Sequence, residues 1–158
     1  MNNKLMFSSD KEDWETPTWL FNKLDKEFKF TLDPCCTEKT AKCKLYYTKK
    51  ENGLIKSWDK NIVFVNPPYG KEISKWVRKS YLSSEHGATV VMLIPSRTDT
   101  NWFHNYIYNK PFVEIRFLRG RIKFLQNGKL INSAPFPSAI VIFKEHDKDI
   151  PTFSTLEI

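Results

Sequence analysis

The spacing of apolar residues predicts three helices. Leu20, Leu24 and Phe28 recur every four residues, which is typical of a helix that buries one face. Thr16-Pro17 stands immediately before this stretch, as a cap followed by a proline that suits the first helical position. The helices are expected over 17–27, over 71–85, and after a cap at Asp99 or Thr100.

Short runs of β-branched and aromatic residues between these helices predict strands. The run Ile62–Val65 is apolar at every position, which is typical of a strand covered on both faces in a parallel sheet. Strands are expected over 30–32, 45–47, 62–65, 89–94, 113–118 and 139–143. Asp33-Pro34 is expected to end the first strand, and an Asn127-Gly128 turn predicts a hairpin within the excursion 119–137.

The alternation of strands and helices predicts an α/β fold with a compact, shortened Rossmann-like sheet, helices on both faces and a C-terminal β-hairpin excursion. With 158 residues the chain is expected to form a single domain over 14–146. The segments 1–13 and 147–158 are expected to be a flexible N-terminus and a C-terminal tail. Ligands in such sheets bind beyond the carboxyl ends of the strands.

Cysteine usage and hydropathy predict a cytoplasmic protein. The three cysteines, two of them adjacent, fit neither a disulfide framework nor a zinc site, and the three histidines lack the spacing of metal ligands. No apolar run is long enough for a signal peptide core or a transmembrane helix. No metal and no membrane partner are therefore expected.

The charge balance favours a polyanionic partner. The formal net charge is +7, and basic residues cluster with two phenylalanines around the start of the excursion 119–137. Such a ribbon can follow the phosphates of a nucleic acid, although a solvated hairpin face is an equal alternative. The candidate DNA contacts are Arg97, Arg116, Arg119, Arg121 and Lys123. For Arg97, a local ion pair with Asp99 is an equally good interpretation.

The segment Asn66-Pro67-Pro68-Tyr69 follows the buried run 62–65 directly and is predicted to be a catalytic loop. The Asn66 side-chain oxygen and the Pro67 carbonyl can accept hydrogen bonds from the two N–H groups of one planar amine or amide. The prolines restrict φ, so these acceptors are held in place in advance, and Tyr69 offers a ring for stacking. A proline-rich turn without chemistry is the alternative.

Several segments together resemble those of N6-adenine DNA methyltransferases, and most closely the small bacteriophage Dam-like family. The residues that carry the resemblance are Trp14-Glu15-Thr16-Pro17, Leu32-Asp33-Pro34-Cys35, Val65-Asn66-Pro67-Pro68-Tyr69, Ser96-Arg97-Thr98-Asp99-Thr100, Arg119-Gly120-Arg121-Ile122-Lys123-Phe124 and Pro135-Phe136-Pro137-Ser138. The resemblance covers about residues 13–144, and the Asn-Pro-Pro-Tyr element is its most specific part.

This resemblance implies a methyltransferase that uses S-adenosyl-L-methionine to methylate the N6 amine of an adenine flipped out of duplex DNA. It implies that Thr16 and Pro17 contact the methionine end of the donor and that Asp33 lies near its amino group. The full set of implied donor-binding residues is Trp14, Thr16, Pro17, Asp33, Pro34 and Asn66.

Two departures from the family pattern keep other functions open. The glycine-rich turn after the first strand is replaced by Cys35-Cys36-Thr37-Glu38, and only about thirty residues separate Asp33 from Asn66. Glu51 is the nearest candidate for the acidic residue that binds the donor ribose. The alternatives are the same fold acting on RNA adenine or a protein glutamine, and a catalytically decayed nucleic-acid-binding domain.

Overall fold

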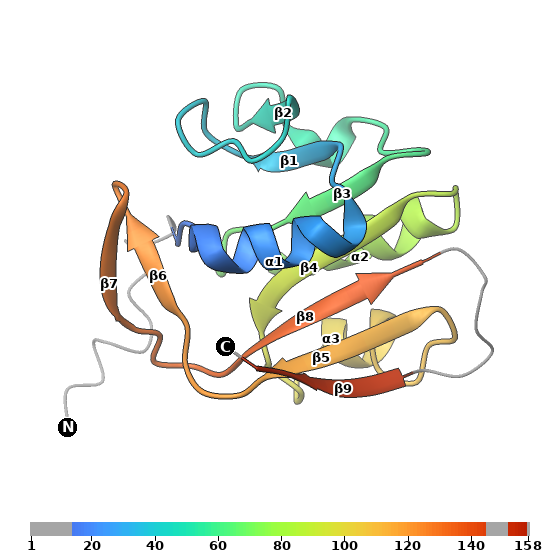
Figure 1. Ribbon diagram of the computed structural model, residues 1–158. Coiled ribbons are helices and arrows are strands. Elements are labelled where there is room, and N and C mark those ends of the chain that lie inside the picture. The colour runs from blue at the N-terminus through green and yellow to red at the C-terminus, as the bar shows by residue number, and fades with distance from the viewer. Residues whose placement is uncertain (1–13, 145–151, 158) are drawn as a thin grey trace.

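The computed structural model describes residues 14–144 and 152–157 and shows a central mixed sheet with helices on both faces (Figure 1). Helix α1 (Thr18–Phe28) covers one face, while α2 (Ile73–Ser84) and α3 (Asn101–Tyr106) cover the other (Figure 1). The strands of the sheet are β1 (Leu32–Cys36), β2 (Leu45–Thr48), β3 (Ile62–Val65), β4 (Thr89–Pro95), β5 (Val113–Leu118), β8 (Ser138–Phe143) and β9 (Thr152–Leu156). The predicted α/β class is confirmed.

The strand order is β2-β1-β3-β4-β8-β5-β9, and β8 is antiparallel to both of its neighbours. The chain runs outward from β1 to β2 and then returns to β3 on the other side of β1. The order therefore reverses between β1 and β3, which is where open α/β sheets bind ligands. We call the side formed by the carboxyl ends of β1, β3, β4, β5 and β9 the carboxyl edge.

Apolar stripes from the helices account for burial of the sheet on both faces. Leu20, Leu24 and Phe28 of α1 are buried as their spacing predicts. Phe21 of α1 packs edge-on against Phe64 of β3, with ring centroids 5.2 Å apart. Because helices also cover the opposite face, β4 and β8 are apolar at nearly every position.

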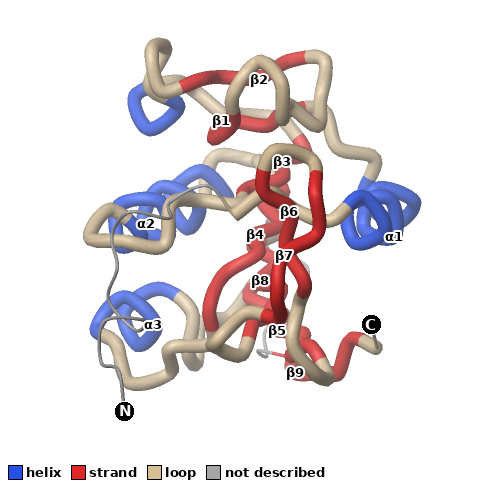
Figure 2. Tube along the Cα trace, turned by 90° about the vertical axis from the view of Figure 1, so that its left-hand side faces the viewer, coloured by secondary structure: helices blue, strands red, loops and turns tan. Residues whose placement is uncertain are grey.

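The predicted hairpin is formed by β6 (Lys123–Gln126) and β7 (Lys129–Ser133). It leaves the main sheet between β5 and β8, and Figure 2 shows it standing in front of the ends of β3, β4 and β8. Asn127 and Gly128 form its tip with positive φ values of 51° and 74°. Consecutive positive φ values are what a two-residue hairpin turn requires, and they explain the Asn-Gly pair.

The first strand does not stop at Asp33-Pro34 as expected, because β1 continues to Cys36. Its register with β2 shifts between Asp33 and Cys36. Pro34 lacks an N–H group, and an irregularity of this kind lets a strand contain proline without an unmade ladder bond. Asp33 therefore lies inside the strand, three residues before its end at Cys36, and not just past the end as expected.

The C-terminal region also differs from the expectation. Part of the segment 147–158, expected to be a tail, forms β9 at the edge of the sheet, parallel to β5. Its residues are mostly exposed, so the strand lacks the continuous apolar run that identifies β4 or β8. The expected N-terminal flexible segment, 1–13, lies outside the described residues. No helix among the described residues has the length and hydropathy needed to cross a bilayer.

Candidate active site at the carboxyl edge

Asn66 immediately follows β3, and three other residues fix the orientation of its side-chain amide. The Nδ2 group donates to the Trp14 carbonyl at 2.5 Å and to the Thr16 hydroxyl oxygen at 3.0 Å. The Oδ1 atom therefore faces the other way and accepts a hydrogen bond from the Tyr69 hydroxyl at 2.7 Å. Since an amide oxygen has two lone pairs, Oδ1 can accept one further hydrogen bond.

Pro67 and Pro68 restrict the backbone of the turn that follows β3. We call this turn, residues 66–69, the Asn66 corner. Pro67 is buried and Pro68 is half-buried. Among the described residues, no group donates a hydrogen bond to the Pro67 carbonyl. Asn66 and Pro67 can thus offer two acceptor oxygens from adjacent residues of a restricted backbone.

Tyr69 lies inside the protein, with 9% of its surface exposed. Its hydroxyl also lies 3.2 Å from the Leu93 carbonyl of β4. Burial raises the pKa of the Tyr69 phenol well above its ordinary value, so the hydroxyl stays protonated and acts as a donor. The ring expected to stack on a base is covered in this conformation, so the stacking role remains a prediction that needs the ring to become exposed.

An aromatic cluster surrounds the corner and joins it to the hairpin. The Tyr69 ring packs edge-on against Phe124 of β6 and Phe136, with centroids 6.0 and 5.6 Å apart. Trp14 contacts the same two rings at 5.2 and 5.6 Å. The sequence places these four rings far apart along the chain, and hydrophobic pattern alone did not identify Phe124 and Phe136 as neighbours of the catalytic loop.

Asp33 lies on the neighbouring strand β1 and is only 3% exposed. Its carboxylate accepts backbone hydrogen bonds from Cys35 at 3.3 Å and Lys42 at 3.0 Å, but it forms no ion pair with any described residue. Burial raises its pKa despite these hydrogen bonds. A buried carboxylate without a cation is complementary to a positively charged ligand group.

Thr16 and Pro17 lie where α1 begins, next to Asn66. Thr16 is buried and its hydroxyl contacts Asn66, as described above. Pro17 is the N-cap of α1 and supplies no side-chain hydrogen bond to the first turn. The first N–H groups of the helix therefore have no side-chain acceptor from the cap, and such a terminus favours a negatively charged group.

Gly53 and Glu51 lie in the segment between Asp33 and Asn66, which is shorter than in the family pattern. A Cβ atom on Gly53 would lie 2.1 Å from the Pro34 carbonyl oxygen, so only glycine fits this close approach. The Glu51 carboxylate accepts hydrogen bonds from the Thr48 hydroxyl and, at 2.9 Å, from the Thr48 N–H group. Glu51 thus lies just past the carboxyl end of β2, one strand away from Asp33.

The five candidate DNA contacts differ in how far their charges are paired. Arg116 points to the α1 face, where it forms a bidentate ion pair with Glu27 at 2.6 and 2.7 Å and a second pair with Glu114. These carboxylates raise the pKa of Arg116 and neutralise its charge. Arg97, Arg121 and Lys123 are exposed and form no ion pair with a described residue. The predicted Arg97–Asp99 pair is not formed.

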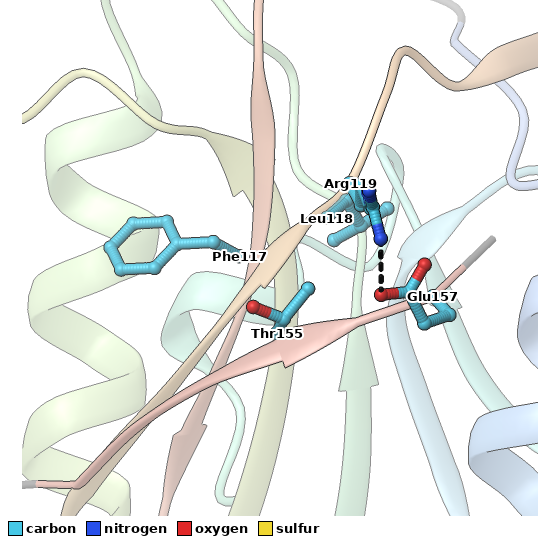
Figure 3. Close-up of a pocket in the computed structure, with 5 residues that line it drawn as sticks. All are labelled: Phe117, Leu118, Arg119, Thr155 and Glu157. Atoms are coloured by element: carbon cyan, nitrogen blue, oxygen red, sulfur yellow. Dashed lines mark hydrogen bonds and ion pairs between the residues drawn. The ribbon is translucent and has the colours of Figure 1, made fainter.

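Arg119 borders a shallow depression at the ends of β5 and β9, with a cavity volume of about 350 Å³ (Figure 3). Its guanidinium pairs with Glu157 at 3.4 Å, and both side chains are exposed, by 77% and 66%. Exposed ion pairs of this kind contribute little stability, so Arg119 can exchange Glu157 for another anion. The depression is separate from the Asn66 corner but lies on the same carboxyl edge.

Glu15 is a site residue to which the sequence assigned no role. Its backbone exchanges two hydrogen bonds with Leu125 of β6, and its carboxylate contacts the hairpin tip. The Asn127-Gly128 turn leaves two backbone N–H groups that need hydrogen-bond acceptors. No local sequence pattern shows that the acceptor is Glu15, 112 residues from Asn127. Within the described residues, no cluster of three or more acidic, histidine or cysteine side chains is arranged to hold a metal.

Comparison with known proteins identifies the family. The order of the sheet, with polar residues at its reversal point, defines a Rossmann-like α/β fold with a ligand site at the carboxyl edge. The chain belongs to the DNA N-6-adenine-methyltransferase (Dam) family, whose model matches residues 4–157. This membership makes it an adenine-specific DNA methyltransferase, and it confirms the family resemblance seen in the sequence.

Two phage proteins named DNA N-6-adenine-methyltransferase are similar to the chain. The protein of Haemophilus phage HP1 is 32% identical over 140 residues, which cover 86% of this chain and 80% of that protein. The protein of Escherichia phage T1 is 33% identical over 92 residues, which cover 57% of this chain and 38% of that protein. A solved structure of an Agrobacterium tumefaciens protein described as a predicted O-methyltransferase shares 14% identity with a TM-score of 0.38, and covers 71% of this chain and 52% of its own.

Proposed function

We propose that the chain transfers a methyl group from S-adenosyl-L-methionine directly to N6 of an adenine that is flipped out of duplex DNA. The observation that carries this proposal is the Asn66 corner. Trp14 and Thr16 occupy the Nδ2 donor group of its amide, so that Oδ1, which accepts from the Tyr69 hydroxyl, keeps one lone pair for a further hydrogen bond.

The corner supplies what an unreactive amine needs. The lone pair of N6 is delocalised into the adenine ring, so the amine is a poor nucleophile. Asn66 Oδ1 and the Pro67 carbonyl accept its two N–H groups, which favours a pyramidal nitrogen with a lone pair free to form the new N–C bond. The proton that N6 then loses passes to solvent, and catalysis rests on positioning and electrostatics.

The residues around β1 and the start of α1 fit the donor. When bound, S-adenosylmethionine supplies a methyl group that its sulfonium has already activated. The Asp33 carboxylate, which forms no ion pair with a described residue, would hold the donor ammonium group, with Pro34 next to it on the same strand. Thr16 and Pro17 would place the methionine carboxylate at the uncapped start of α1, beside the Trp14 backbone.

The exposed cations on and beside the hairpin would hold the DNA. Arg97, Arg121 and Lys123 have free charges, and Arg119 is only weakly paired, so these four can contact phosphates on the side from which a base would enter. Arg116 is left out of this proposal because its charge is already neutralised by Glu27 and Glu114.

The test is to incubate the protein with methyl-labelled donor and matched duplex DNA, RNA and protein acceptors, then to identify the labelled product. We expect N6-methyladenine from DNA and little label elsewhere. Label in RNA adenine or in glutamine would support the alternative acceptors. Calorimetry that shows no donor binding would support a decayed domain and overturn the proposal.

A further inference from the structure

Among the described residues, the Glu15 side chain is the one that hydrogen-bonds the tip of the β6–β7 hairpin. The Glu15 carboxylate accepts hydrogen bonds from the backbone N–H groups of Asn127 at 2.9 Å and Gly128 at 3.3 Å. Two successive N–H groups in left-handed conformation form a small concave anion site, which the carboxylate fills. The Glu15 backbone also exchanges two hydrogen bonds with Leu125, at 3.0 and 2.9 Å, so this segment lies along β6 like a third strand.

The same segment holds the catalytic amide from its other side. Both residues that accept hydrogen bonds from Asn66 Nδ2, Trp14 through its carbonyl and Thr16 through its hydroxyl, are immediate neighbours of Glu15. The Trp14 ring additionally packs against Phe124 of β6. Three consecutive residues therefore connect the hairpin tip to the group that fixes Asn66.

We infer that Glu15 is a positioning residue that couples the hairpin to Asn66, so that the catalytic amide is correctly oriented only while the hairpin is fastened. This inference rests on the proposed function, because it takes Asn66 as the acceptor for N6 and the hairpin as a DNA contact. Glu15 itself touches neither reactant. A hairpin that docks on DNA is then mechanically joined to the corner that receives the base, which ties methyl transfer to DNA docking.

A purely structural role for Glu15 has a different signature. If Glu15 only stabilised the hairpin, its loss would lower the melting temperature and weaken DNA binding, while kcat at saturating DNA stayed unchanged. Coupling to Asn66 instead predicts a loss in kcat, because a misplaced amide acts on the bound complex.

The experiment compares Glu15→Ala and Glu15→Gln with Glu85→Ala, an exposed glutamate at the end of α2, on the opposite side of the sheet from the carboxyl edge. Glu15→Ala is expected to lower kcat roughly 10- to 100-fold, the effect of misplacing a catalytic group by about 1 Å, with the Kd for DNA changed less than about threefold. Glu15→Gln keeps one acceptor oxygen and should fall between Glu15→Ala and the parent protein. Glu85→Ala should behave like the parent.

Nuclear magnetic resonance gives a readout that needs no activity. The Asn66 side-chain N–H resonances, assigned by their loss in Asn66→Ala, should shift or broaden in Glu15→Ala without donor or DNA present, and less so in Glu15→Gln. Parental kcat and unmoved Asn66 resonances in a folded Glu15→Ala or Glu15→Gln variant would overturn the coupling. Failure of the parent protein to methylate DNA adenine would instead refute the proposed function, while the resonances would still test whether Glu15 holds Asn66.

Discussion

Asn66 and Asp33 lie on neighbouring strands at the same side of the sheet, yet the chain holds them in opposite ways. The Asn66 amide is oriented by side-chain and backbone groups 50 and 52 residues earlier, together with nearby Tyr69. The Asp33 carboxylate is held by backbone N–H groups only two and nine residues later. One group is fixed by tertiary structure and the other by a local turn.

Asn66 and Asp33 also differ in the interactions that each side chain can still form with a ligand. Asn66 has its donors occupied and an acceptor lone pair available, which suits a neutral amine. Asp33 has hydrogen-bond partners but no counter-ion among the described residues, which suits a cation. This difference is the basis for proposing that β3 carries the acceptor side of the reaction and β1 the donor side, and the predictions below test the proposed site.

The largest effect is expected from Asn66→Ala. Loss of the oriented oxygen should lower kcat about 10³-fold, the effect of removing a preorganised group from a developing charge. Donor affinity should fall much less than kcat, because Asp33 is untouched and only the Asn66 contacts to Trp14 and Thr16 are lost on the donor side. Single-turnover methyl transfer and calorimetry measure the two quantities, and an Asn66→Ala protein with the parental transfer rate would remove the corner from catalysis.

Asp33→Asn should show the reverse pattern. Removing the charge opposite the donor ammonium should weaken donor binding roughly 30-fold, corresponding to about 2 kcal/mol, with a smaller change in kcat at saturating donor. Since burial raises the pKa of Asp33, donor affinity of the parent should fall as the pH is lowered, beginning at a higher pH than for an ordinary carboxyl group. Asp33→Asn should lack this pH dependence, and an identical pH profile in both proteins would contradict the donor assignment.

A third prediction separates free from neutralised cations. Arg121→Glu or Lys123→Glu should weaken DNA binding about tenfold and reduce the dependence of log Kd on log salt by about one unit. Arg116→Ala is the matched control. Its loss should lower the free energy of unfolding by about 1 kcal/mol, because the exposed Glu27 loses its ion pair and the half-buried Glu114 keeps only the more distant Lys144, and should leave the salt dependence unchanged. If all three variants changed the salt dependence of DNA binding equally, the distinction between free and neutralised cations would be wrong.

The smallest effect is expected from Tyr69→Phe, which keeps the ring and removes the hydroxyl that donates to Asn66. We expect kcat to fall about fivefold, near the net worth of one hydrogen bond. Tyr69→Ala should be far more damaging, since it also opens a cavity beside Phe124 and Phe136. A Tyr69→Phe protein with full activity would show that the hydroxyl does not contribute to orienting Asn66 for catalysis.

Most of the fold followed from local pattern. The strands 62–65 and 113–118 were predicted with the bounds that the structure shows. The first is an uninterrupted apolar run, as in a strand covered on both faces, whereas the second places Glu114 and Arg116 between apolar residues. Asn127-Gly128 predicted the hairpin because few other residue pairs accept two consecutive positive φ values. The Asn-Pro-Pro-Tyr loop was placed at a strand end because two prolines directly follow the apolar run 62–65.

What local pattern missed depends on partners far away along the chain. Asp33-Pro34 looked like a strand stop, but a shift in pairing with β2 accommodates the proline. The edge strand β9 has no apolar run, and only its pairing with β5 defines it. Arg116 looked like its basic neighbours, and only the fold brings Glu27 of α1 within 2.6 Å of it. Glu15 stood in a recognised segment, but its contact with the hairpin tip is purely tertiary.

The most direct test of the central claim is a crystal structure with a donor analogue and a DNA duplex that contains the target adenine. The account predicts that N6 lies within hydrogen-bond distance, about 3 Å, of both Asn66 Oδ1 and the Pro67 carbonyl oxygen, with the donor beside Asp33. An adenine bound elsewhere, or an Asn66 amide turned so that Nδ2 faces the base, would contradict it.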